Sequence, residues 1–71
     1  MNGNGVAVYR DRLLRRFLVV ETAGRLWLVP NSPDGWQRRL PLALAPDARR
    51  DRLTPAPSAD LSFLGIPNKA S

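Results

Sequence analysis

The 71-residue chain contains no cysteine and no histidine. Without cysteine it can form neither a disulfide bond nor a thiolate metal site, and without histidine it lacks the commonest general base and zinc ligand. These absences exclude serine–histidine and cysteine–histidine catalysis, zinc fingers and thiol redox chemistry. The chain also lacks an apolar run of the roughly 20 residues that a membrane-spanning helix needs. We therefore expect no metal, no cofactor and no membrane span.

Carboxylates are the main remaining acid–base groups, and there are only six. A chain this short offers little cleft in which two of them can be held at a catalytic separation. Asp47 and Asp51 are spaced to share a helical face, as a hard-metal site requires, but the neighbouring arginines favour surface ion pairs instead. We expect no catalytic residue, no small-molecule substrate and no enzymatic activity.

The cellular location follows from two further absences. Residues 1–5 contain no basic region followed by an apolar stretch, so we expect no secretory signal there. A chain without cysteine is also compatible with a reducing compartment, where disulfide bonds are rare. Together these observations predict a cytoplasmic protein.

Positive charge is the first feature that the chain does have. Eleven basic residues against six acidic ones give a net charge of +5, and ten of the eleven are arginine. Such an excess favours a polyanionic partner, which is nucleic acid, anionic lipid or an acidic protein face. A GC-rich coding sequence would produce the same bias toward arginine, alanine and proline without selection for binding.

Two β-favouring apolar runs, at residues 17–20 and 26–29, are joined by a short loop that contains Ala23 and Gly24. This pattern predicts a β-hairpin over 17–29. A turn-rich segment follows, and residues 36–40 are expected to form a third strand that ends at Pro41. The predicted fold is mainly β, of the small α+β class: a three-stranded antiparallel meander with short helical turns in the C-terminal part.

Residues 6–16 are compatible with two structures. As a helix they would place Val6, Leu13 and Phe17 on one face, with Arg10 in the middle of that face. In the other structure, residues 6–9, with the β-branched Val6 and Val8, would form an extra strand that turns near Arg10 and Asp11. The sequence leaves both alternatives open.

Composition divides the chain into four segments. Residues 1–5 are expected to be a flexible N-terminus, 6–40 a small β-rich folded unit, 41–57 an extended connector rich in proline, alanine and arginine, and 58–71 a short helical or extended tail. Short helices are predicted at residues 47–53, after Pro46, and at residues 58–64, between Ser58 and Gly65.

Arginines that alternate with aromatic residues form the main candidate binding site. Guanidinium groups attract phosphates, and an aromatic ring can stack on an unpaired base. The competing interpretation is that the two tryptophans belong to the core and the arginines keep its rim in water. The candidate nucleic-acid-binding residues are Arg10, Arg12, Arg15 and Arg16, near Tyr9 and Phe17, together with Trp36, Arg38 and Arg39.

An apolar tail lies beyond the proline-rich segment. Such a tail either docks onto a partner or closes the core of its own chain. Both alternatives stay open, because the hairpin needs cover on its second face. The candidate docking residues are Leu61, Phe63, Leu64 and Ile66.

Two functional hypotheses from different classes follow. The first is a non-enzymatic nucleic-acid-binding or regulatory protein that uses the arginine clusters. The alternative is a protein–protein interaction module, such as a small subunit, an inhibitor or a homodimer, that uses the hairpin and the tail. The charge favours the first hypothesis, and the small core of a short chain favours the second.

Overall fold

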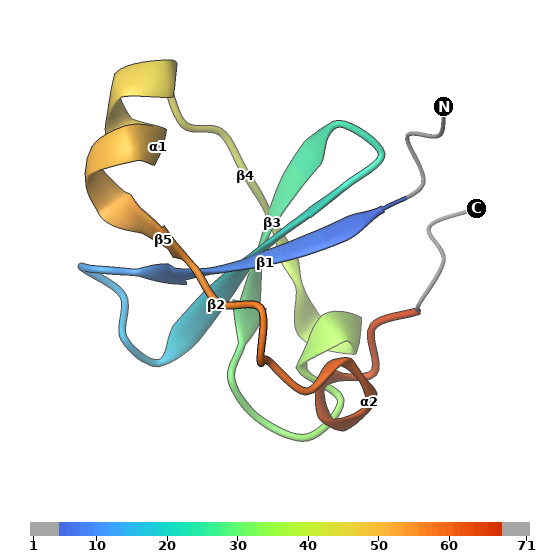
Figure 1. The fold of residues 1–71 in the computed structure, drawn as a ribbon. Helices are drawn as coiled ribbons and strands as arrows, with labels where there is room; N and C mark the ends of the chain where they lie inside the picture. The colour runs from blue at the N-terminus through green and yellow to red at the C-terminus, as the bar shows by residue number, and fades with distance from the viewer. Residues whose placement is uncertain (1–4, 68–71) are drawn as a thin grey trace.

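Apolar residues along the chain build a five-stranded antiparallel sheet with the strand order β4-β3-β2-β1-β5 (Figure 1). The structure describes residues 5–67 and is a computed structural model. The first four strands form a meander, and β5 returns along the outer edge of β1. The mainly β class is confirmed, with five strands where three were predicted. The elements are β1 (Val6–Asp11), β2 (Phe17–Thr22), β3 (Arg25–Pro30), the 3₁₀ helix η1 (Gly35–Arg38), β4 (Leu40–Leu42), α1 (Pro46–Arg52), β5 (Leu53–Pro55) and α2 (Leu61–Leu64).

The predicted hairpin is confirmed as β2 and β3. Its register runs from Phe17 opposite Pro30 to Thr22 opposite Arg25. The two-residue turn has positive φ angles at Ala23 (53°) and Gly24 (76°). Positive φ angles at both positions give the turn a twist that matches the twist of the flanking strands.

Residues 6–11 are a strand, so the helical alternative for this segment is wrong. Val8 of β1 lies opposite Val20 of β2, and both side chains enter the core. The alternation places Val6 and Val8 inside and leaves Arg10 exposed at the end of the same face. Pairing with a preformed hairpin edge outweighs the weak helical periodicity of this short segment.

The predicted strand at residues 36–40 is wrong. The chain forms η1 first, and the next strand, β4, lies on both sides of Pro41. Asp34 adopts a left-handed conformation (φ 55°), and the amide of Gly35 donates to the carbonyl oxygen of Ser32 at 3.0 Å, which begins the helical turn. Pro41 is tolerated because β4 is an edge strand, where a missing amide donor costs little.

Residues 41–57, expected to be an extended connector, contain most of β4, all of α1 and β5. The helix begins at Pro46, as the sequence predicts. Strand β5 pairs with β1, with Pro55 opposite Tyr9, and the amide of Ala56 donates to the carbonyl oxygen of Val8 at 2.8 Å. This segment therefore belongs to the sheet.

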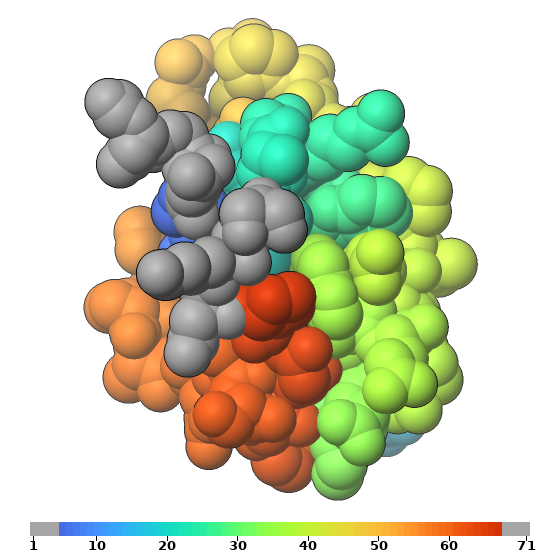
Figure 2. Space-filling view, turned by 90° about the vertical axis from the view of Figure 1, so that its right-hand side faces the viewer, coloured from blue at the N-terminus to red at the C-terminus, as the bar shows by residue number. Residues whose placement is uncertain are grey.

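The C-terminal segment closes the core over one face of the sheet. Leu64 and Ile66 are buried against the β1–β3 face, so these two candidate docking residues are core residues and do not face solvent. The helix is shorter than predicted, because Asp60 and not Ser58 is its N-cap and accepts a hydrogen bond from the amide of Phe63 at 3.1 Å. Figure 2 shows this segment, in red and orange, packed beside the yellow-green η1 region.

Helix α1 crosses the opposite face. The guanidinium of Arg49 pairs with Glu21 of β2 at 3.2 Å, and the hydroxyl of Tyr9 donates to the same carboxylate oxygen at 3.3 Å. Beneath this cover Val19 and Leu26 are buried. Both faces of the hairpin are therefore covered within one chain.

Within residues 5–67, no helix is both long enough and apolar enough to cross a bilayer. The predicted flexible N-terminus, apart from Gly5, and residues 68–71 of the predicted tail lie outside the described part of the chain.

Candidate nucleic-acid interface

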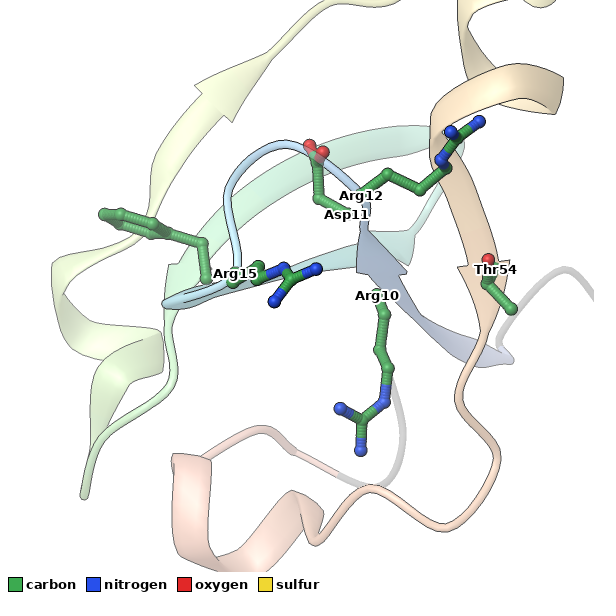
Figure 3. A pocket seen from close by; sticks show the side chains of 6 residues that line it. Arg10, Asp11, Arg12, Arg15 and Thr54 are labelled. Atoms are coloured by element: carbon green, nitrogen blue, oxygen red, sulfur yellow. The ribbon is translucent and has the colours of Figure 1, made fainter.

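A hollow of about 530 Å³ opens where β1 ends and the chain turns toward β2 (Figure 3). It takes residues from β1, from the turn at residues 12–16, from the first residue of β2 and from β5. Its walls therefore come from both ends of the folded chain. The lining residues are Arg10, Asp11, Arg12, Arg15, Phe17 and Thr54.

The turn at residues 12–16 is held by the side chain of Asp11. Its Oδ1 atom accepts hydrogen bonds from the amides of Leu13 at 2.8 Å and Leu14 at 3.3 Å. The amide of Phe17 then donates to the carbonyl oxygen of Leu14 at 3.0 Å, and the amide of Arg12 donates to that of Arg52 at 2.9 Å. Local side-chain and backbone hydrogen bonds therefore fix the backbone that carries the arginines.

The negative charge of Asp11 is compensated by an arginine. Its carboxylate is fully buried and pairs with the guanidinium of Arg52 at 2.6 Å. Burial alone would raise the pKa of Asp11, but the hydrogen bonds from Arg52, Leu13 and Leu14 and the charge of Arg52 hold it below its ordinary value. The one carboxylate that lines the hollow is thus ionised and already compensated.

The arginines of the hollow carry charge that the neighbouring chain does not compensate. Arg12 donates to the backbone carbonyl oxygen of Asp51 at 3.1 Å, which is a neutral acceptor. For the side chains of Arg10 and Arg15, the structure of residues 5–67 gives no hydrogen bond or ion pair. Figure 3 shows Arg10 extending away from the end of β1 and Arg15 pointing toward that strand end, whereas Arg12 extends toward α1. The hollow is therefore lined by three arginines and by one carboxylate whose charge is compensated, and such a surface can hold phosphate groups.

The second arginine cluster is arranged differently. The guanidinium carbon of Arg39 lies 4.7 Å from the ring centroid of Trp27 and 4.2 Å from that of Trp36. The two rings meet edge to face, with centroids 6.1 Å apart. The Nη1 atom of Arg39 also donates to the carbonyl oxygen of Trp36 at 3.1 Å. Arg39 therefore occupies the ring surface that a base would need.

Arg38 likewise binds its own chain. Its Nη2 atom donates to the hydroxyl of Ser32 at 2.7 Å and to the carbonyl oxygen of Pro33 at 3.3 Å. None of Trp36, Arg38 and Arg39 lines the hollow. The structure does not bring the two predicted clusters into one site.

The arginines of α1 also bind groups of their own chain. In α1, Arg50 pairs with Asp47 at 2.6 Å, while Arg49 and Arg52 pair with acids of the sheet. Arg16 is exposed beside the hollow but does not line it. No group of three or more potential metal ligands occurs within residues 5–67.

The sequence reasoning missed the structural role of Asp11 and the participation of Thr54. A signal for Asp11 exists, because aspartate commonly accepts hydrogen bonds from amides two and three residues later. No local signal places Thr54, which reaches the hollow only because β5 pairs with β1. Comparison with family models, curated proteins and solved structures gave no match. Function is therefore inferred from the chemistry of the hollow.

Proposed function

We propose that this chain is a small non-enzymatic protein that binds nucleic acid through the hollow at the end of β1. Arg10, Arg12 and Arg15 bind backbone phosphates, and Phe17 contacts an unpaired base. One observation carries the proposal: three arginines line one hollow, and the carboxylate there is already paired with Arg52. A regulatory role would follow from such binding.

Nucleic acid fits this chemistry better than a compact anion does. Guanidinium groups bind phosphate oxygens through paired hydrogen bonds, and a chain of phosphates engages several arginines at once. The aromatic ring of Phe17, half-buried at the wall, supplies an apolar surface on which a base can stack. Arg16 adds charge at the rim. Trp36, Arg38 and Arg39 no longer belong to the proposed site, because their side chains bind one another and their own backbone.

Fluorescence anisotropy with a labelled single-stranded oligonucleotide of about 12 nucleotides tests the proposal. Three phosphate contacts predict that the logarithm of the binding constant falls with the logarithm of salt concentration with a slope of about −2. Arg10→Gln and Arg15→Gln should each weaken binding and reduce the slope by about 0.7. Binding that salt does not weaken, or no binding at low salt, would contradict the proposal.

Arg25→Gln is the matched control. It removes the same charge from the tight turn of the β2–β3 hairpin, at the opposite end of the β1–β2 ladder from the hollow. We expect it to leave the affinity within about twofold of the original. An equal loss from Arg25→Gln would show that net charge alone drives binding. Tighter binding to anionic lipid vesicles than to the oligonucleotide would also count against nucleic acid.

A protein–protein interaction module is the second candidate. Two large apolar side chains outside the hollow support it: Leu40 is 56% exposed on the edge strand β4, and Phe63 is 45% exposed on α2. Of the four predicted docking residues, Phe63 alone is exposed, since Leu61 packs partly against the core. Light scattering separates the two candidates, because an oligomer without bound nucleic acid supports the second.

We also propose a cytoplasmic location, which the absence of cysteine supports.

A further inference from the structure

The most exposed of the large hydrophobic side chains in residues 5–67 is Leu13, at 70%, and it lies inside the arginine-rich turn. Leu14, beside it, is 37% exposed. Arg12 and Arg15, which line the hollow, flank this pair directly in the sequence. Phosphate binding alone does not require an apolar pair at this position.

The exposure of Leu13 is built into the turn. The amides of both leucines are bound to the buried carboxylate of Asp11, and Arg52 holds that carboxylate from α1. The carbonyl oxygen of Leu14 accepts a hydrogen bond from Phe17 at the start of β2. An ordered backbone therefore presents the two side chains next to the hollow, and their burial on binding would require little reordering.

The apolar pair distinguishes unpaired from paired nucleic acid. In a duplex the faces of the bases are stacked on one another, and only the base edges, which include the thymine methyl group, and the phosphates are accessible. In an unpaired strand the faces are accessible, and apolar or aromatic side chains pack on them. A leucine next to a phosphate-binding hollow therefore gains more contact area with an unpaired strand than with a duplex.

Resting on the proposed function, we propose that Leu13, supported by Leu14, is the specificity-determining residue that favours unpaired strands over duplexes. The arginines supply attraction that both forms share, and the apolar tip of the turn supplies the difference between them. The preference is therefore separable from the salt-dependent affinity.

The experiment compares two probes: the labelled single strand, and the same strand annealed to its complement. For Leu13→Ser we expect the single-strand affinity to fall about fivefold, as loss of roughly half a leucine's burial implies, with the duplex affinity changed less than about twofold. The salt slope for the single strand should stay unchanged, because no phosphate contact is lost. Leu40→Ser, which removes another highly exposed leucine, 56% exposed on β4, should change neither affinity.

The experiment distinguishes a failure of the proposed nucleic-acid binding from a failure of the proposed role of Leu13. If the unsubstituted protein binds neither probe, the proposed function fails. If it binds both and Leu13→Ser leaves their ratio unchanged, the specificity role of Leu13 is overturned while nucleic-acid binding stands. Thermal melting of Leu13→Ser should match that of the unsubstituted chain, because the side chain makes little contact in the folded state; Leu14→Ser provides a second variant with the same expected direction.

Discussion

The turn at residues 12–16 and the η1 segment at residues 35–39 both carry arginines near an aromatic residue, which is Phe17 for the turn and Trp36 for η1. The two sets of arginines have different structural roles. In the first, a buried carboxylate holds the backbone, Arg12 donates to one carbonyl oxygen, and the side chain of Arg15 makes no hydrogen bond or ion pair within residues 5–67. In the second, Arg38 and Arg39 hold the segment themselves through Ser32, Pro33 and the tryptophan rings. In this chain, an arginine beside an aromatic residue stays available for binding where another side chain holds the backbone, as Asp11 does in the turn.

The position of one acidic side chain explains the difference. Asp11 ends β1 with its carboxylate under α1, where Arg52 and two amides converge on it. Asp34 precedes η1, but its side chain makes no capping hydrogen bond, so the segment is stabilised by its arginines instead. Three substitutions test this contrast.

The largest effect is expected from Gly35→Ala, which displaces the η1 segment. A Cβ atom at this position would overlap the carbonyl oxygen of Pro30, which is a backbone atom that cannot rotate away. We expect a loss of about 3 kcal/mol in the free energy of unfolding, measured by urea denaturation. Gly5→Ala is the control, since nothing lies within 4 Å of its Cβ position. Equal stability of the two variants would show that η1 does not need its close approach to β3.

Asp11→Asn tests the first region and should cost about 2 kcal/mol, because a partly buried Arg52 loses its counter-ion. The pKa of Asp11 lies lower in the folded than in the unfolded chain, so its contribution is complete above the unfolded value of about 3.9 and disappears as the pH falls through the folded value. The difference in stability between the two proteins should therefore shrink below about pH 4. A difference that stays constant down to pH 2 would contradict this role.

Arg39→Ala should have the smallest of the three effects, about 1 kcal/mol, because the contacts with the two tryptophan rings are partly exposed to solvent. Arg15→Ala should change stability by less than about 0.5 kcal/mol, since the side chain of Arg15 makes no hydrogen bond or ion pair within residues 5–67. Measured together, the pair separates a structural arginine from a free one. Tryptophan fluorescence should change in Arg39→Ala only. A greater loss of stability in Arg15→Ala would reverse the comparison.

Local patterns predicted a large part of the fold. The turn at Ala23 and Gly24 and the first turn at Pro46 occur where sequence signals place them, because these signals depend on the backbone preferences of a few adjacent residues. The position of residues 36–40 between a turn-rich segment and Pro41 predicts a strand, yet the left-handed Asp34 starts a helical turn there. Segment 6–11 could not be assigned locally, because its partner strands decide its conformation.

The candidate site was only partly predictable. Arg10, Arg12 and Arg15 were identified from charge and spacing, and they do line one hollow. The involvement of Trp36 was expected on the same grounds, but ring contact with Arg39 is a matter of geometry that spacing along the chain does not encode.

The sequence by itself determined the limits of the chemistry: no thiol, no imidazole and an excess of guanidinium groups. It also determined the hairpin, since backbone preferences act between neighbours. Tertiary structure alone decided which arginines are paired and which are not, because the partners of Asp11 and Glu21 lie about forty and about thirty residues away along the chain. A charge is common to every conformation of the chain, whereas its compensation depends on which segments the fold brings together.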